Sequence, residues 1–244
     1  MNQEKYGDAF FKNRHQKTVY SAETILGNVL QEIPEVNSAV DFGCGVGTWL
    51  SVLNDQGVTT VQGYDGFWVN TELLEIPAQC FTQVNLEESV ALDRRFDLAI
   101  SLEVAEHLQP GAADTFVETL TSAADFVLFS AAIPAQGGNQ HVNEQWQQYW
   151  CDLFEKREYQ AVDLLRTRIW NDNKIPIWYR QNILLFVQQE RMSELKSNAP
   201  AETGFPVSVV HPEMYQSKVE QMETIKGTLK AFRRTVRKWI RKAG

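Results

Sequence analysis

Three glycines stand at every second position after a short apolar run that ends in an acidic residue. Asp41 is followed by Gly43, Gly45 and Gly47, and a predicted helix begins at Thr48. Glycine accepts positive φ angles and lets a ligand approach the backbone closely, while the first turn of a helix offers free N–H groups. A dinucleotide fingerprint would place its third glycine at position 48, one residue later than here. The stretch therefore predicts a corner that binds a nucleotide-type cofactor, with Asp41 beside it.

A second acidic residue, Asp65, ends the next predicted strand, which covers residues 59–64. A carboxylate at the end of the second strand of such a unit can accept hydrogen bonds from both hydroxyls of a ribose. Because Asp65 is followed by glycine, a plain turn is the alternative. We predict that Asp65 binds ribose, since the glycine corner precedes it by one βαβ unit.

A third group of polar residues follows the clearest buried strand, residues 96–102. Glu103, Glu106 and His107 stand there, at the carboxyl end of a strand, where open α/β sheets bind ligands. Glu103 is expected to face a cationic part of the cofactor or the second substrate. Its alternative role is that of a carboxylate at a helix start, where the helix dipole favours negative charge.

The elements that must position these residues alternate along the chain. Apolar residues at helical spacing, with a proline just past the last of them, predict a first helix over residues 5–33. Further helices are predicted at 48–55, 113–124 and 144–158. Strands are predicted at 36–40, 59–64, 81–84, 96–102 and 126–130, a sixth within 161–170, and a seventh at 181–187. This order predicts a Rossmann-like α/β fold: a seven-stranded, mostly parallel sheet with helices on both faces, in which the last two strands form a hairpin.

Four motifs in this order, over residues 36–130, resemble the cofactor-binding half of class I S-adenosylmethionine (SAM) methyltransferases. The run from Ser101 to Leu108 is similar to the "EVxEH" motif of ubiquinone-type and other small-molecule methyltransferases. Residues 5–188 as a whole look like a bacterial methyltransferase-domain family found with glycan and secondary-metabolite genes; segments 130–146 and 178–182 carry this closer likeness. The resemblance implies SAM as cofactor, adenine held by Asn85 and Leu86, and Ser101 in the cofactor site. It implies methyl transfer without settling the acceptor.

An alcohol or amine acceptor must lose a proton, and histidine is the usual base near neutral pH. His141 lies on the loop after the fifth predicted strand, where acceptors bind, and is the favoured base; His107 is the second candidate. The alternative for His141 is a hydrogen bond that orders its loop. Glu103, Glu106, His107 and His141 could be considered as metal ligands, but their spacing alone does not support a site, and no metal is predicted.

The acceptor-facing half of the sequence is dense in aromatic and amide side chains, a combination that suits a polar ring such as a sugar. The aromatic residues are Trp146, Tyr149, Trp150, Trp170, Trp178 and Tyr179, and the amides are Asn139, Gln140, Asn143, Gln181 and Asn182. A glycosyl or other small-molecule acceptor is therefore expected, although each ring taken singly is more commonly a core residue. Two alternatives are open: a SAM-binding or scaffolding protein without turnover, and a nucleotide-dependent oxidoreductase, which Thr48 disfavours.

Charge divides the chain into an acidic body and a basic tail. The 244 residues have a net charge of −8, but residues 191–244 alone have 11 Lys/Arg against 5 Asp/Glu. An acidic body excludes general nucleic-acid binding, so no nucleic-acid partner is expected. Three cysteines without zinc-type spacing and no signal-like start predict a reduced, cytoplasmic protein.

The basic tail has the pattern of an amphipathic helix. Apolar residues recur every three or four positions, and between Lys226 and Lys242 there are eight basic residues and no acid. We therefore expect two parts, a methyltransferase domain over 1–190 and a linker with a basic helix over 191–244. Through residues 215–242 the helix is expected to contact an anionic membrane, at its inner face. Pairing of two tails in a homo-oligomer and packing back on the acidic body are the alternatives.

Overall fold

The computed structural model describes residues 8–196, 207–224, 228–229, 231–233 and 236. The chain divides into two compact units, residues 1–209 and residues 210–244. The first unit extends past residue 196 because residues 207–209 bond to it: the carbonyl of Val207 accepts from Arg166 (2.8 Å), and that of Val209 accepts from Gln147 (3.1 Å). The second unit is described by itself below.

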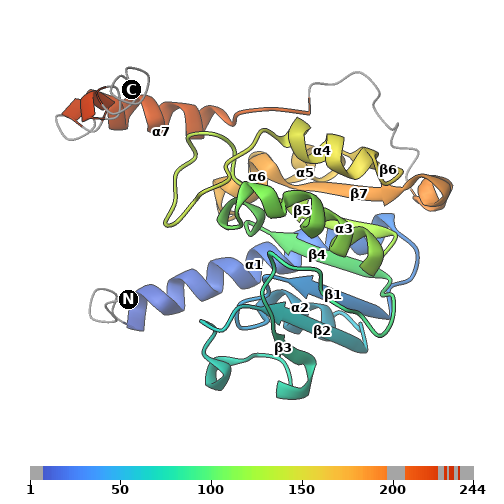
Figure 1. The fold of residues 1–244 in the computed structure, drawn as a ribbon. Helices are drawn as coiled ribbons and strands as arrows, with labels where there is room; N and C mark the ends of the chain where they lie inside the picture. Colours follow the sequence, from blue (N-terminus) through green and yellow to red (C-terminus); the bar gives the residue numbers. More distant parts are fainter. Residues whose placement is uncertain (1–7, 197–206, 225–227, 230, 234–235, 237–244) are drawn as a thin grey trace. The chain divides into compact units, whose positions relative to one another are not determined.

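A seven-stranded sheet forms the centre of the first unit (Figure 1). Its strands, in chain order, are β1 (Ser38–Phe42), β2 (Thr60–Asp65), β3 (Phe81–Gln83), β4 (Leu98–Leu102), β5 (Phe126–Ser130), β6 (Tyr159–Val162) and β7 (Leu184–Gln188). Their order across the sheet is β3-β2-β1-β4-β5-β7-β6, and β7 is antiparallel to both of its neighbours. The predicted fold class, with seven strands and one reversed strand, is confirmed.

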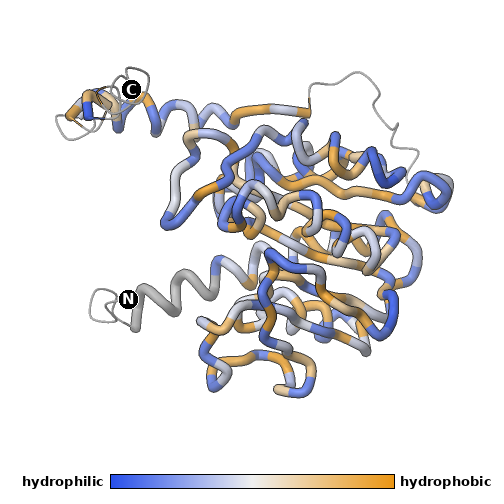
Figure 2. The backbone as a smooth tube through the Cα atoms, in the orientation of Figure 1, coloured by the Kyte–Doolittle hydropathy of each residue, from blue (hydrophilic) through white to orange (hydrophobic). Residues whose placement is uncertain are grey.

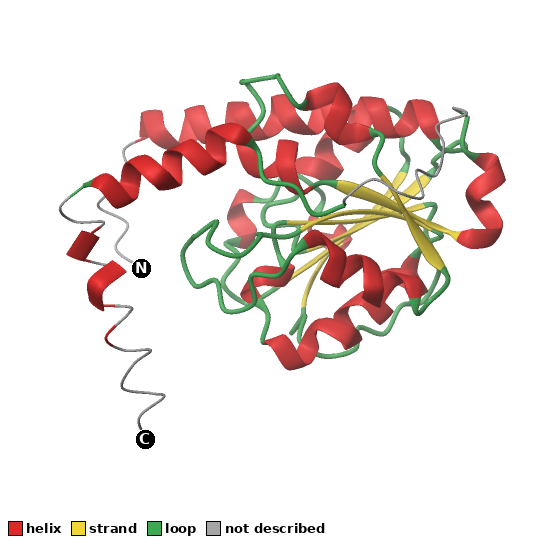
Figure 3. Cartoon of the chain, turned by 90° about the horizontal axis from the view of Figure 1, so that it is seen from above, coloured by secondary structure: helices red, strands yellow, loops and turns green. Residues whose placement is uncertain are grey.

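Helices cover both faces of the sheet (Figure 3). One face packs against α1 (Asp8–Glu32), α2 (Thr48–Asp55) and α5 (Leu165–Ile169), and the other against α3 (Ala113–Ala123) and α4 (Gln147–Glu155). The helix α6 (Ile177–Asn182) leads into β7. Buried on both faces, the central strands are mostly apolar, as Figure 2 shows by colour, and Asp41 in β1 and Ser101 in β4 are buried polar exceptions.

Alternation along each strand divides the apolar side chains between the two cores. In β4, Leu98 and Ile100 belong to the core under α1 and α2, whereas Ala99 belongs to the core under α3 and α4. In the second core, Phe154 and Phe186 stack with ring centroids 3.8 Å apart. This packing holds β7, and with it the preceding α6, in a defined place beside β5.

Three predicted elements differ from the structure. Residues 165–169, predicted as part of the sixth strand, form the helix α5, and the strand itself lies earlier, at Tyr159–Val162. The segment 177–182, predicted as a connector and the start of the last strand, is helical. Both segments are short, and their burial against the sheet outweighs their weak local preference. As a result β6 and β7 are antiparallel neighbours joined through two helices, and not a tight hairpin.

The third difference concerns the segment after β4. Residues 103–108, predicted to start a helix, form a single 3₁₀ turn, η4 (Ala105–His107). Pro110 begins a second short turn that leads into α3. The chain therefore stays at the carboxyl end of the sheet over residues 103–112 and does not leave it along a helix.

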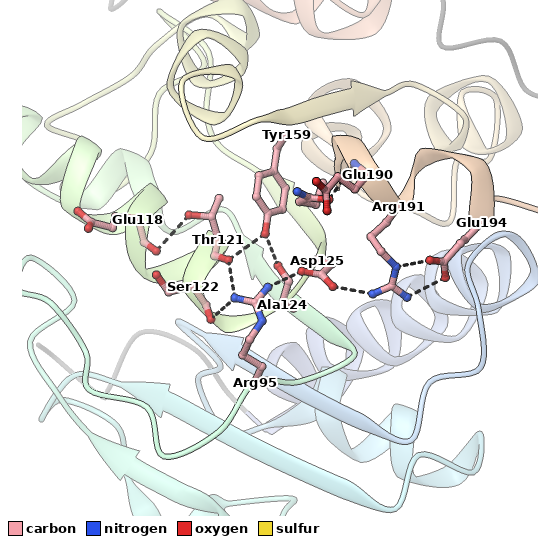
Figure 4. A network of polar contacts seen from close by, with 11 residues as sticks. Arg95, Glu118, Thr121, Ser122, Ala124, Asp125, Tyr159, Glu190, Arg191 and Glu194 are labelled. Carbon is pink, nitrogen blue, oxygen red and sulfur yellow. Dashed lines mark hydrogen bonds and ion pairs between the residues drawn. The ribbon is translucent and has the colours of Figure 1, made fainter.

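Charged residues close the opposite, amino end of the sheet (Figure 4). Asp125, just before β5, pairs with Arg95 and with Arg191, and Arg191 also pairs with Glu194. The hydroxyl of Tyr159 lies 2.8 Å from two carbonyl oxygens, those of Thr121 in the last turn of α3 and of Ala124 just past its end, and its proton is shared between them. These contacts fasten the ends of several elements without using any residue of the predicted site.

The second unit contains α7 (Pro212–Glu223), with proline in its first turn, where a backbone N–H would have no intrahelical acceptor in any case. Leu229, Phe232 and Val236 of the predicted apolar stripe are exposed at least in part. Two further stripe positions, Ile225 and Trp239, and most of the basic residues from Lys226 onward lie outside the described residues. None of the helices in the described parts of the chain is long and apolar enough to cross a membrane.

Candidate active site

The glycine corner between β1 and α2 has the left-handed backbone conformation that glycine favours. Gly43 and Gly47 have φ angles of +89° and +88°, in the left-handed region that favours glycine. A Cβ at position 43 would lie 2.2 Å from a methyl carbon of Val104, and one at position 47 would lie 2.8 Å from Ile76. Val104 belongs to the segment after β4, so the glycine corner and that segment are packed together.

Asp65 ties the corner to the end of β2. Its carboxylate is buried and accepts hydrogen bonds from the backbone N–H of Gly45 (2.7 Å) and of Gly66 (2.6 Å). Burial raises the pKa of Asp65 above its ordinary value, and these hydrogen bonds oppose the shift. Burial also raises the pKa of Asp41 well above its ordinary value, and the charge of Asp65 adds to that effect. Two buried carboxyl groups at one corner favour a ligand with positive charge.

An exposed tryptophan lies against this corner, and the sequence analysis did not find it. Trp68 is 76% exposed, and its ring lies so close to Gly66 that a Cβ there would come within 2.1 Å of it. The only signal in the sequence is an aromatic pair, Phe67 and Trp68, directly after Asp-Gly.

Glu103 is held by amide side chains from two distant segments. Its carboxylate accepts hydrogen bonds from Gln136 (2.8 Å) and Asn182 (3.0 Å), and these two amides also bond to each other (2.9 Å). Its backbone has a φ of +57°, which is unusual for a residue with a side chain, and its N–H donates to the carbonyl of Ser130 (2.9 Å). Asn182 and Gln181 are buried, so they support Glu103 and do not form the sugar-facing wall that their sequence positions suggested.

Glu106, His107 and His141 meet beside this network. The rings of His107 and His141 are perpendicular, with centroids 4.9 Å apart, and Glu106 is 1% exposed. The loop that carries His141 is held beside Glu106 because Val142 and Asn143 both donate their backbone N–H to the carbonyl of Glu106 (2.9 and 3.0 Å). The structure thus brings together both histidines that the sequence singled out.

Electrostatics in this cluster follow from burial. Burial raises the pKa of Glu106 to about 9, helped by the charge of Glu103, whose own pKa is also raised by burial. Burial lowers the pKa of His107, and the nearby His141 lowers it further, whereas the charge of Asp65 opposes the shift.

Glu144 organises the loop around His141. Its carboxylate accepts the N–H groups of Ala135 (2.8 Å) and Gly137 (2.7 Å) and also contacts Nδ1 of His141 (3.0 Å). Gly138 leaves room for the imidazole, since a Cβ there would lie 2.0 Å from Nε2 of His141. The contact that was the alternative to a catalytic role of His141, a hydrogen bond that orders its loop, is present; it uses Nδ1 and leaves Nε2 for other contacts.

The remaining predicted cofactor residues occupy different environments. Asn85 is exposed, and its side chain accepts from the N–H of Glu87 (3.1 Å) and donates to Glu88 (2.8 Å), so it closes a local turn. Leu86 is a buried core residue. Ser101 is fully buried in β4, and its hydroxyl has no hydrogen-bond partner within the described residues.

A family model described as a methyltransferase domain matches residues 13–165, more than half of the chain. The chain belongs to this family of class I SAM-dependent methyltransferases. No curated protein matches it in sequence. Solved structures with the same fold include magnesium protoporphyrin IX methyltransferase from Synechocystis PCC 6803 with bound S-adenosylhomocysteine. That chain is 19% identical with a TM-score of 0.51, and the match covers 77% of this chain and 90% of that one.

Two further solved structures are much longer than the matched part. The small RNA methyltransferase HEN1 is 17% identical with a TM-score of 0.50, and the match covers 78% of this chain but 26% of that one. Streptomyces venezuelae DesVI is 19% identical with a TM-score of 0.45, over 54% of this chain and 58% of that one. This methyltransferase therefore spans less than two thirds of both proteins, and at these identities the likeness shows the fold alone.

The residues of the glycine corner fit SAM as cofactor. The left-handed glycines leave space where side chains would otherwise stand, and Asp65 retains oxygen lone pairs for ribose hydroxyls beyond its two backbone bonds. SAM is cationic at its sulfonium and ammonium groups, which suits the buried carboxyl groups of Asp41 and Asp65.

Replacement of Asp41 by asparagine tests the electrostatics of the cofactor-free protein. Because folding raises the pKa of Asp41, the folded state binds the proton more tightly, and wild-type stability falls as pH rises above the ordinary value of 3.8. Asp41→Asn removes this loss. Its free energy of unfolding should gain on the wild type by up to about 1.4 kcal/mol for each pH unit between pH 5 and pH 7. Urea unfolding at both pH values measures this, with Asp55→Asn, an exposed carboxyl on α2, as control; a pH-independent difference would contradict it.

Proposed function

We propose that this methyltransferase moves the methyl group of SAM to a hydroxyl group, or an amine, of a small-molecule or glycosyl acceptor. The observation that carries the proposal is the packing of the cofactor corner against the histidine cluster: Val104, three residues before His107, lies against Gly43, and the ring of His107 lies beside that of His141. A cofactor site and titratable side chains that can activate an acceptor thus face the same place. The alternative is a SAM-binding or scaffolding protein without turnover.

SAM supplies an electrophilic methyl group on a sulfonium, and the chain supplies binding, orientation and removal of a proton. Asp65 and the glycines hold the nucleoside part, while the carboxyl groups of Asp41 and Glu103, which ionise once a cation lies beside them, hold the methionine ammonium. The acceptor oxygen forms a bond to the methyl carbon as the bond from that carbon to sulfur breaks, which yields S-adenosylhomocysteine. The hydroxyl proton passes to Nε2 of His141, which Glu144 leaves free by contacting Nδ1. His107 is the second candidate for this role.

The acceptor class is inferred from the side chains on the surface around His141. Asn139 and Gln140 are exposed on its loop, and Trp146 (45% exposed) follows it. Trp178 is 39% exposed on α6, the helix that also supplies Asn182 to Glu103. Aromatic faces beside amides suit a sugar ring, which supports a glycosyl acceptor. Trp150 is core and takes no part in this surface.

Replacement of Asp65 by asparagine should weaken SAM binding at least about 10-fold, because the loss of a charged hydrogen-bond acceptor costs about 1.5–3 kcal/mol. Calorimetric titration of SAM and S-adenosylhomocysteine into the wild type and Asp65→Asn measures this. Asp55→Asn, on the surface of α2, should bind as the wild type does. If Asp65→Asn binds SAM with wild-type affinity, Asp65 does not contact the cofactor. Failure of the wild type to bind either ligand would overturn the proposed function.

Replacement of His141 by alanine should lower methyl transfer by about 10²–10⁴-fold and leave SAM affinity unchanged, because the residue acts on the acceptor alone. Formation of S-adenosylhomocysteine is measured against nucleotide sugars, lipid-linked sugars, phenols and carboxylates. His211→Ala, in the second unit, is the matched control. Turnover at the wild-type rate in His141→Ala would show that His141 is not the base. Formation of S-adenosylhomocysteine with phenols or carboxylates alone would show that the acceptor is not a sugar.

For the C-terminal segment we infer contact with an anionic membrane surface through residues 215–242, which would place the enzyme at the inner face of the membrane. Exposed Leu229 and Phe232, with Arg233 between basic neighbours in the sequence, support this. The full chain should sediment with vesicles that contain phosphatidylglycerol, and a chain that ends at Val209 should not. Phe232→Asp should lose most of the binding. Equal sedimentation of all three would contradict the membrane role, and a change of oligomeric state on truncation would instead favour pairing of two tails.

A further inference from the structure

Glu106, His107 and His141 have more in common than their position beside the acceptor. Each offers one metal-ligating atom, and these atoms all lie within 4.8 Å of one another. Among the described residues this is the one group of three such side chains that comes so close together. The spacing in sequence did not predict it, because His141 comes from the loop after β5 and the other two from the turn after β4.

One carboxylate oxygen of Glu106 is buried and has no hydrogen-bond partner among the described residues. Glu106 itself is 1% exposed, so bulk water does not compensate for this missing contact. A buried acceptor without a donor is costly, and native proteins usually satisfy it. A cation at the cluster would supply the missing partner for this oxygen.

The imidazole of His141 is oriented as metal-ligating histidines usually are. Such histidines use one ring nitrogen for the metal and donate the other N–H to a carboxylate or a backbone carbonyl. Nδ1 of His141 contacts the carboxylate of Glu144 (3.0 Å). This ring therefore has one nitrogen engaged in an outer contact and Nε2 left for the cluster.

We propose that Glu106, His107 and His141 bind a divalent first-row transition-metal cation beside the acceptor position. Two imidazoles and one carboxylate form the ligand set of many open catalytic sites, in which further positions are filled by water or substrate. With ligand bonds of about 2.0–2.2 Å, two ligand atoms of one cation lie at most about 4.4 Å apart. The three ligand atoms here lie within 4.8 Å of one another, so a small rotation of the exposed side chain of His107 brings them to bonding distance.

This inference rests on the proposed function only for its catalytic consequence. With a cation bound, His141 is a ligand, and the acceptor hydroxyl would be activated by coordination as a Lewis base, its proton leaving to solvent. The methyl carbon still exchanges its bond to sulfur for a bond to the acceptor oxygen. Loss of transfer in His141→Ala is expected in either case, so metal binding must be measured directly.

The full chain, freed of metal with EDTA and dialysed, is titrated with Co²⁺, followed by its visible absorption, and with Zn²⁺, followed by calorimetry. One equivalent should bind with micromolar affinity or tighter. His107→Asn and Glu106→Gln should each weaken binding at least about 10-fold, and Glu118→Gln, an exposed glutamate on α3, should not change it. Glu144→Gln should weaken binding about 10-fold or more through the orientation of His141. SAM affinity of each variant, measured in the same way, shows that the fold is kept.

The outcomes separate this inference from the proposed function. Absence of saturable Co²⁺ and Zn²⁺ binding, or binding that survives in both His107→Asn and Glu106→Gln, would overturn the metal site while SAM binding and methyl transfer remain testable. With an acceptor in hand, EDTA should abolish transfer, and Co²⁺, Zn²⁺ or Mn²⁺ should restore it. Methyl transfer at an unchanged rate by the EDTA-treated enzyme would overturn the catalytic part of the inference. His141 would then be the base, as in the proposed function.

Discussion

The parallel direction of β1, β2, β4 and β5 is the constraint on which the site depends. Because these strands run the same way, the chain leaves each of them at the same edge, and the residues that follow them converge there. Asp65, Glu103 and the loop of His141 are separated in sequence but all follow strand ends. The two cores hold this arrangement rigid, since both faces of the central strands are buried.

Several carboxyl groups are buried at this edge, which is costly in a protein without compensating partners. The chain compensates with neutral donors: backbone N–H groups on Asp65 and amide side chains on Glu103. One buried oxygen of Glu106 has no hydrogen-bond partner among the described residues, and burial holds the pKa of Asp41 well above its ordinary value. Positive charge is what these groups still require, and the cationic cofactor and the proposed metal ion would supply it at two neighbouring places.

The pattern of residue types along the chain was sufficient to predict most helices and strands, and it failed where the segments were short. The glycine corner, α2 and β5 have the predicted bounds because their residue types admit one conformation or a continuous apolar run. Residues 165–169 and 177–182 became helices because packing against the sheet decided their conformation. The turn over 103–108 likewise depends on the contact between Val104 and Gly43, which no local pattern contains.

The sequence by itself determined the fold class, the cofactor corner and the residue types at the strand ends, since these depend on glycine conformation and on apolar periodicity. Only the tertiary structure decided that Gln136 and Asn182 serve Glu103, that Asn85 closes a turn, and that His107 and His141 share one cluster. The reason is that these contacts join loops at the sheet edge, where side-chain distances follow from strand order and from loop hydrogen bonds such as those of Glu144, and not from spacing along the chain.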